Sequence, residues 1–312
     1  MLFRSLTSIK MKKLNSLLLA GLISLGAIAQ SSANTLLWKI SGKELAKPSY
    51  LYGTIHLICS DEAELSTNLK NAIKEAEEVY FEVDLDNIFE MMGAMNQMKM
   101  KGDTTLKDLL SVEEYEKVRS YFESKGSLLP FSMLETFKPM LAASTLEKGS
   151  MPCGNTTMME QVIMEEAKRS GKKVQGLETM QYQAGLLDSI PYRYQAKQLV
   201  EYISQSDNSA ADDQMKAMFK AYRDQDLKKL EVLMMETDPG MAKFTDILLF
   251  NRNRNWVEKL ARLMKEKGLV IAVGAGHLPG EKGVLSLLRE ADRKSTRLNS
   301  SHEWISRMPS SA

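Results

Sequence analysis

Two of the chain's three histidines stand in the same local frame, at the end of an apolar run and three residues after a glycine. His56 ends Leu51-Tyr-Gly-Thr-Ile-His, and His277 ends Val273-Gly-Ala-Gly-His. Imidazole exchanges a proton near neutral pH and is the commonest metal ligand in proteins. The repeated Gly-x-x-His motif therefore indicates a site for proton transfer or metal binding, although a histidine that caps or packs a turn would also explain each copy alone.

Carboxylates and arginines extend this set of candidate site residues. Glu82 lies in the strand-like run Val79-Tyr-Phe-Glu-Val-Asp84, Glu178 ends a second such run, and Arg252 and Arg254 open a long helical pattern. A buried charge without a partner is costly, so Glu82 either faces water at a sheet edge or points into a polar site. Glu178 could equally be an acid at a helix N-terminus. The arginines could hold an anion or a site carboxylate, or could belong to a solvated helix start.

Two imidazoles and a carboxylate can hold a divalent metal ion with a position open for water, or can run acid–base hydrolysis without a metal. In the metal version the ligands are His56, His277 and Glu82, with Glu82 as third ligand or general base, and the three side chains approach within roughly 10 Å of one another. Glu178 and Arg252 are the further catalytic candidates. The sequence contains no Gly-x-Ser-x-Gly, Walker A, Cys-x-x-Cys or His-Glu-x-x-His motif, which argues against the chemistries that use them.

The elements that must position these residues indicate an α/β fold. Strand patterns alternate with helical patterns at 61–78, 182–206, 211–225, 227–236 and from about 250 onward. This alternation predicts a central, mostly parallel sheet flanked by helices, whose ligands bind beyond the carboxyl ends of the strands. Residues 85–170 are helical in pattern without a strand signal. We predict that they form a helical insertion over that rim.

The composition is that of an ordinary globular protein, and the N-terminus predicts export. Hydrophobic residues make up 44%, and 41 basic against 40 acidic side chains leave a net charge of +1, so no nucleic-acid partner is indicated. Lys12 and Lys13 precede the apolar run Leu17–Ala29, which ends in a small-x-small cleavage site. Residues 1–29 are therefore predicted to be a secretory signal peptide, with Met11 as a second candidate start. We expect a periplasmic or secreted mature chain without a transmembrane anchor.

The mature chain is expected to form one domain over residues 30–292. Residues 293–312 are rich in Ser and Arg, lack any period and resemble the translation of a sequencing adapter. They are predicted to be disordered and artefactual, and His302 is excluded from the site. Cys59 and Cys153 are the two cysteines, which in an exported chain indicates one disulfide; two free thiols are the alternative. Such a bridge would pin the loop that carries His56.

At these residues the chain resembles the TraB/GumN family, which includes the Tiki proteases and is distantly similar to erythromycin esterases and haem-binding ChaN proteins. The resemblance extends from Leu37 to Glu290. It rests on an ordered set of motifs, which are Leu51-Tyr-Gly-Thr-Ile-His56, Glu82 in Phe-Glu-Val-Asp, Gly176-Leu-Glu178-Thr, Arg252-Asn253 with Trp256, and Val273-Gly-Ala-Gly-His277-Leu.

The resemblance to the Tiki branch implies a metal-dependent peptidase whose two Gly-x-x-His histidines and a glutamate form the site. Carried over to this chain, these are His56, His277 and Glu82, around a divalent metal ion and a peptide or small-molecule substrate. The ChaN likeness implies the alternative, a non-catalytic binder of haem or metal with tyrosine or histidine at the same rim. The family pattern also leads us to expect an acidic residue around Gly154–Thr157, which this chain lacks there.

Overall fold

The computed structural model describes residues 34–42, 44–45, 47–125, 129–146, 153–205, 209–237, 241–296 and 305–307. The predicted signal peptide lies outside these residues. No helix in the described part of the chain is long and apolar enough to cross a membrane.

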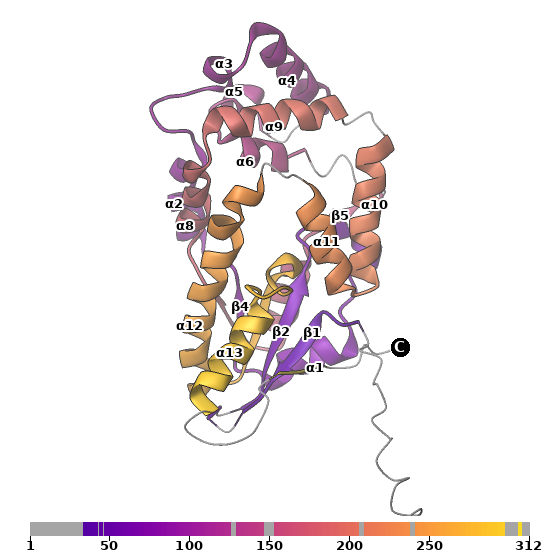
Figure 1. Cartoon of the computed structure of the whole chain (residues 1–312), viewed down its shortest axis with the longest axis vertical. Coiled ribbons are helices and arrows are strands. Elements are labelled where there is room, and N and C mark those ends of the chain that lie inside the picture. The colour runs from indigo at the N-terminus through magenta and orange to yellow at the C-terminus, as the bar shows by residue number, and fades with distance from the viewer. Residues whose placement is uncertain are drawn as a thin grey trace, which may run out of the picture. The chain divides into compact units, whose positions relative to one another are not determined.

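A mixed sheet lies at the centre of the fold (Figure 1). Its strands follow one another in the order β6 (Lys173–Gly176), β4 (Glu78–Phe81), β7 (Leu269–Gly274), β2 (Ser49–Thr54), β1 (Leu37–Ile40) and β8 (Ile305–Arg307). The first four are parallel to one another, whereas β1 runs antiparallel to β2 and β8 antiparallel to β1. The predicted α/β class with a mostly parallel central sheet is confirmed.

Both faces of the sheet are buried, because successive side chains of a strand point to opposite faces. In β4, Val79 and Phe81 join one apolar cluster and Tyr80 joins the other. The first face is covered by α1 (Thr67–Glu75), α7 (Met159–Arg169), α10 (Ser209–Arg223) and α11 (Leu227–Thr237), and the second by α12 (Asn251–Glu266) and α13 (Val284–Thr296). Fully burying a Val or Phe side chain stabilises the fold by about 1.5–3 kcal/mol, so this packing fixes which side chains reach each face.

A third apolar cluster holds a separate group of helices together, seen at the top of Figure 1. They are α2 (Ile88–Met98), α3 (Leu106–Leu109), α4 (Val112–Lys125), α5 (Phe131–Leu134), α6 (Pro139–Ser144) and α9 (Tyr192–Gln205). The structure differs from the predicted insertion at 85–170 in two details. Its core includes α9, and it contains the short strand β5 (Thr156–Thr157), which is too short to show an alternating pattern.

Two predicted boundaries differ from the structure. The helix expected from Asp61 begins at Thr67, because the Ser66 side chain accepts a hydrogen bond from the Leu69 N–H at 3.2 Å and caps it. Asp61 lies instead in the 3-10 turn η1 (Ser60–Glu62). The strand expected over 79–84 ends at Phe81, so the carboxylate that follows belongs to the loop beyond the strand.

The expectation of a C-terminal tail without structure is wrong at two places. Helix α13 continues to Thr296, and residues 305–307 form β8. Strand β8 pairs with β1, with Ile305 opposite Ile40 and Arg307 opposite Trp38. Without this pairing β1 would be an edge strand, and edge strands expose N–H and C=O groups that readily accept another strand.

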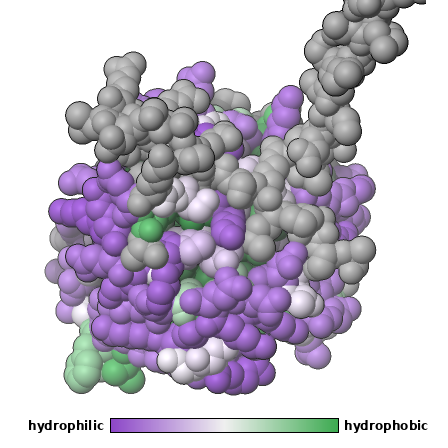
Figure 2. All heavy atoms as spheres, turned by 90° about the horizontal axis from the view of Figure 1, so that it is seen from below, coloured by the Kyte–Doolittle hydropathy of each residue, from purple (hydrophilic) through white to green (hydrophobic). Residues whose placement is uncertain are grey.

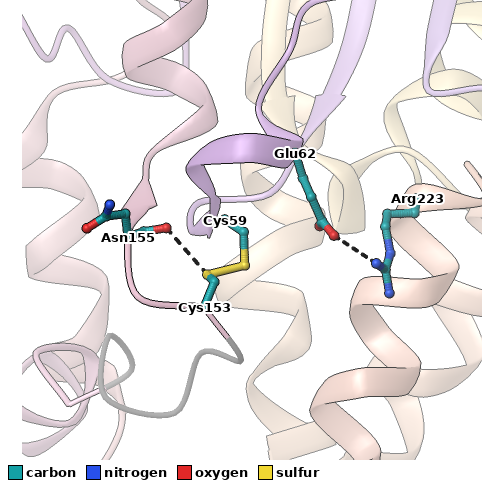
Figure 3. Close-up of a disulfide and its surroundings, with 5 residues drawn as sticks. All are labelled: Cys59, Glu62, Cys153, Asn155 and Arg223. Atoms are coloured by element: carbon teal, nitrogen blue, oxygen red, sulfur yellow. Dashed lines mark hydrogen bonds and ion pairs between the residues drawn. A yellow bond between two sulfur atoms is a disulfide. The ribbon is translucent and has the colours of Figure 1, made fainter.

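The predicted disulfide between Cys59 and Cys153 is present, with 5.9 Å between the two Cα atoms (Figure 3). It joins β3 (Ile58–Cys59) to the segment before β5, and these two short strands pair with each other. Beside it, Arg223 of α10 forms an ion pair of 2.8 Å with Glu62 of η1 (Figure 3). The loop that carries His56 is thus tied to the chain that leads into α7.

The described surface seen from below is mostly hydrophilic, with hydrophobic residues at its lower left edge and in smaller areas elsewhere (Figure 2). Large apolar side chains that remain exposed are concentrated on α2, where Ile88, Phe89 and Met92 are 61%, 82% and 64% exposed. Apolar exposure in the described part of the chain is therefore largely local to a few helices.

Candidate active site

Four of the five predicted site residues lie just beyond the carboxyl ends of four adjacent parallel strands. Glu178 follows β6, Glu82 follows β4, His277 follows β7 and His56 follows β2. Since the strand order is β6-β4-β7-β2 and all four are parallel, these residues line one rim of the sheet. This is the rim where α/β sheets bind their ligands.

Gly274, the last residue of β7, is the point around which three of these side chains meet. A β-carbon placed on it would stand 3.1 Å from Glu82 Oε1, 3.7 Å from His277 Cδ2 and 3.9 Å from His56 Nε2. Glu82 Oε1 also lies 3.7 Å from His277 Nε2. The three side chains therefore converge well within the predicted separation of roughly 10 Å, and a side chain at Gly274 would intrude between them.

His277 is buried, and its neighbours fix its tautomer. The Asn253 side chain donates its N–H to the Lys282 carbonyl at 2.9 Å, so its Oδ1 is an acceptor, and it lies 2.6 Å from His277 Nδ1. The proton consequently sits on Nδ1, and Nε2 carries the lone pair. Burial lowers the pKa of His277 to about 4, with Glu82 opposing and Arg252 adding to this shift. The ring is therefore neutral at pH 7.

His56 is held in a similar way by a residue from another element. Its Nδ1 lies 2.8 Å from Oε1 of Glu160, a buried residue in the first turn of α7. The same oxygen accepts a hydrogen bond from the Thr54 hydroxyl at 2.7 Å. The His56 side chain is 67% exposed, and its Nε2 faces the space beside Gly274. Both histidines thus have Nδ1 against a side-chain oxygen and Nε2 toward the rim.

Glu82 points into a polar site and not toward water. It is buried, and its carboxylate accepts hydrogen bonds from the Gly274 N–H at 2.8 Å, the Gln183 amide at 2.9 Å and Arg252 Nη2 at 2.6 Å. Burial alone would raise the pKa of Glu82, but positive charge on His277, Arg252 and His56 and the Gly274 N–H together lower it to about 2. Because His277 is neutral at pH 7, Arg252 supplies the lasting positive charge beside this ionised carboxylate.

Arg252 is buried, and all five of its N–H groups face acceptors within the protein. Nε and Nη2 donate to Glu178, Nη2 also donates to Glu82, and Nη1 reaches the Leu248 carbonyl at 2.9 Å and His277 Nε2 at 3.3 Å. The two carboxylates raise the pKa of Arg252 despite its burial. Arg252 therefore holds site carboxylates, one of the two predicted roles, and has no N–H left for a substrate anion.

Glu178 lies behind Arg252 and completes the network. Its second oxygen accepts a hydrogen bond from the Trp256 indole N–H at 3.0 Å. Burial raises the pKa of Glu178, although the hydrogen bonds from Arg252 and Trp256 oppose the shift. The Arg252 guanidinium also stacks 4.7 Å from the Trp256 ring. Arg254, the other arginine considered, is exposed and contacts Asn251, so it takes no part in this network.

Sequence reasoning missed Glu160 and Gln183. The acidic residue expected around Gly154–Thr157 is absent, yet the structure supplies a carboxylate a few residues later, from Glu160 at the start of α7. An acid in the first turn of a helix is favoured by the helix dipole alone. Its sequence position therefore gave no sign of a partner on β2.

The chain matches the family model described as the TraB/PrgY/gumN family over residues 36–297. It belongs to this family. It is 23% identical over 310 residues to the metalloprotease TIKI1 of Danio rerio, an alignment that covers 83% of this chain and 62% of the relative. It is also 22% identical over 313 residues to the metalloprotease TIKI2 of Xenopus tropicalis (84% and 59% covered), and 22% identical over 311 residues to human TIKI1 (83% and 61%).

The chain thus spans about three fifths of the length of these relatives. No solved structure matches it at a significant level. The family membership agrees with the resemblance inferred from the motifs. The relatives' names describe proteases that depend on a metal.

The donor atoms at the rim suit a first-row divalent metal in type and protonation. His56 directs Nε2 toward the Gly274 space, and His277 carries an Nε2 without a proton 3.7 Å from Glu82 Oε1. Glu82 is ionised. Two features stand against a ready-made site. Across the described residues no group of three or more His, Cys, Asp or Glu side chains already stands in a metal-binding arrangement, and the lone pair of His277 Nε2 faces Arg252 Nη1. The donor atoms of these residues suit a metal ion. For His277 to bind it, the Arg252 Nη1 group must first move away from the Nε2 lone pair.

Proposed function

We propose that this TraB/PrgY/gumN-family protein is an exported metal-dependent hydrolase with peptidase-like activity. The observation that carries the proposal is the convergence of the His56, His277 and Glu82 side chains around Gly274, with His277 Nε2 3.7 Å from Glu82 Oε1. Both imidazoles are oriented by acceptors on Nδ1, which is the usual arrangement of histidine ligands in metalloenzymes. The names of the relatives support the same chemistry.

In this proposal His56, His277 and Glu82 hold a divalent ion and leave a position open for water. A metal bound there would polarise a substrate carbonyl and lower the pKa of the bound water. Arg252 neutralises Glu82 and keeps its carboxylate turned toward the rim through the 2.6 Å ion pair. Glu178 and Trp256 hold Arg252 in turn, so these residues position the site and do not contact the substrate.

The structure favours Glu82 as a ligand over Glu82 as a general base. A general base works best with a pKa near the working pH, whereas the pKa of Glu82 is lowered to about 2. Such a carboxylate binds protons weakly at pH 7 and remains available as an anionic donor. Its Oε2 accepts hydrogen bonds from Arg252 and Gln183. Its Oε1 accepts one from the Gly274 N–H and keeps a lone pair for the metal.

Export is supported by the disulfide, because structural disulfides persist in oxidising compartments. The signal-peptide pattern at residues 1–29 agrees with this. Expression of the full chain in a bacterial host tests it directly. We expect the periplasmic fraction to contain a protein that begins at residue 30, and cytoplasmic retention of the uncleaved chain would contradict export.

Metal-dependent cleavage of a peptide library tests the reaction. The mature protein is stripped with a chelator and reloaded with Zn²⁺, Mn²⁺ or Co²⁺, since such N and O donor sites accept several first-row metals. We expect activity with at least one metal, and its loss in His56→Ala and in His277→Ala. His302→Ala, which changes the remaining histidine, is the matched control and should retain activity.

Activity that survives the chelator, or that persists in His277→Ala, would contradict the metal-dependent site. Circular dichroism of each variant separates loss of the site from loss of the fold. Titration with haem covers the alternative of a non-catalytic binder. A Soret band that disappears in His56→Ala, in a protein without peptide cleavage, would favour that alternative.

A further inference from the structure

Glu160 makes contacts at the rim that folding alone does not explain. Its side chain is buried, and Oε1 accepts hydrogen bonds while Oε2 is buried without a hydrogen-bond partner among the described residues. A buried polar atom left without a partner costs about 1–3 kcal/mol. An apolar side chain of similar size would avoid this cost, so the carboxylate has a role other than stability.

The contact with His56 supplies that role. Glu160 Oε1 already accepts the hydrogen bond of the Thr54 hydroxyl. This oxygen is therefore an acceptor, and the 2.8 Å contact places the proton on His56 Nδ1. The lone pair then lies on Nε2, the atom that faces the space beside Gly274. We propose that Glu160 is the positioning residue of His56, holding its ring in the Nδ1-protonated form with Nε2 directed to the rim. The proposal rests on the proposed function for the use made of that lone pair.

The other histidine shows the same construction independently. His277 Nδ1 lies 2.6 Å from Asn253 Oδ1, so each Gly-x-x-His histidine has its own oxygen acceptor on a helix elsewhere in the chain. Asn253 comes from α12 and Glu160 from α7. The difference is that His56 receives a carboxylate. A carboxylate partner raises the basicity of the ligating nitrogen more than an amide does.

The segment before α7 explains why Glu160 stays in place although His56 is exposed. Thr156 and Thr157 pair with Cys59 and Ile58, directly after the His56 loop. The disulfide joins the same two segments (Figure 3). The strand pairing and the disulfide both lie close in sequence to the Glu160–His56 contact. They therefore hold the segment that carries the acceptor against the segment that carries the imidazole.

Nuclear magnetic resonance of the metal-free protein tests the proposal without any reaction. Long-range ¹H–¹⁵N correlations of the histidine rings show which nitrogen carries the proton, and the His56→Gln variant assigns the signals. We expect wild-type His56 to be protonated on Nδ1. We expect Glu160→Leu to convert it to the Nε2-protonated form, which is the commoner form of a neutral imidazole. A wild-type His56 protonated on Nε2 would overturn the proposal without need of a variant.

Zn²⁺ affinity measured by calorimetry gives the second readout. Loss of a partner of a metal-bound histidine typically weakens metal binding about 10–100-fold, and we expect this for Glu160→Leu. Glu165→Leu changes an exposed acid on the same helix and should leave both the tautomer and the affinity unchanged. Glu160→Gln keeps a neutral acceptor and should retain the Nδ1-protonated ring, with intermediate affinity.

The two readouts distinguish failure of the proposal from failure of the proposed function. If Glu160→Leu changes the tautomer while wild-type protein binds no metal and cleaves no peptide, the positioning role stands and the hydrolase does not. If wild-type protein binds metal and Glu160→Leu changes neither the tautomer nor the affinity, the hydrolase stands and the positioning role is refuted.

Discussion

Acidification from pH 7 to pH 5 should destabilise this protein through His277. The folded protein lowers the pKa of His277 from 6.5 to about 4, so below pH 6.5 the unfolded chain binds the proton more readily. Stability from this group is thus full above pH 6.5 and is lost as the pH falls toward 4. At 1.36 kcal/mol per pKa unit the whole shift corresponds to about 3 kcal/mol, of which about 2 kcal/mol is lost between pH 7 and pH 5.

Glu82 acts in a separate and lower window. Its folded pKa is lowered from 4.5 to about 2, so its contribution is intact above pH 4.5 and disappears only as the pH falls below that value. Measurements between pH 7 and pH 5 therefore report mainly on His277, because Glu82 of the folded protein stays ionised throughout this range.

Urea unfolding at pH 7, 6 and 5, followed by tryptophan fluorescence in the presence of EDTA, measures this effect. The chelator prevents a bound metal from protecting the imidazole. We expect the free energy of unfolding of the wild type to fall by about 2 kcal/mol more than that of His277→Asn over this range. His56→Asn is the control for the exposed histidine. If His277→Asn loses as much stability as the wild type, the neutral buried imidazole is refuted.

Three further changes have defined outcomes. Replacing Cys59 and Cys153 with serine reopens a covalent loop with a sequence separation of 94 and should lower the free energy of unfolding by about 4–5 kcal/mol; no change in the urea midpoint would argue against the bridge. Arg252→Met leaves buried carboxylates unpaired and should cost about 3–5 kcal/mol, whereas Arg254→Met on the exposed side should cost less than about 0.5 kcal/mol. Gly274→Ala places a β-carbon 3.1 Å from a site oxygen, so Zn²⁺ affinity should fall while the melting temperature changes little, and unchanged affinity would show that the rim does not use this space.

Much of the rim could be predicted because its signals are local. An apolar run followed by glycine and a polar residue marks a strand end, and parallel strands bring their ends to the same edge. This reasoning placed His56, Glu82 and His277 near one another. The sequence left two environments open for Glu82, a sheet edge that faces water and a polar site. A strand pattern does not show whether an arginine from a distant helix contacts the carboxylate, so only the structure could decide between them.

The partners of these residues could not be predicted for a different reason. Glu160, Gln183 and Asn253 lie on helices, and the residue that a helical side chain meets depends on how the helix docks, which periodicity does not specify. The pairing of β3 with β5 was hidden because two-residue strands carry no alternation. The packing of α9 against the third cluster could not be predicted either, because the apolar face of this helix could pack against several parts of the protein equally well.

The Cys59–Cys153 bridge has a topological consequence for how this protein can change over evolution. The third apolar cluster draws most of its helices from the chain between the two cysteines. The cost of closing a loop grows only with the logarithm of its length, by about 0.6 kcal/mol for each doubling. Insertions between the cysteines can therefore lengthen or remodel that layer while the bridge keeps the two ends of the loop together. A single nick in this region would likewise leave one covalently connected molecule, which separates into fragments only after reduction.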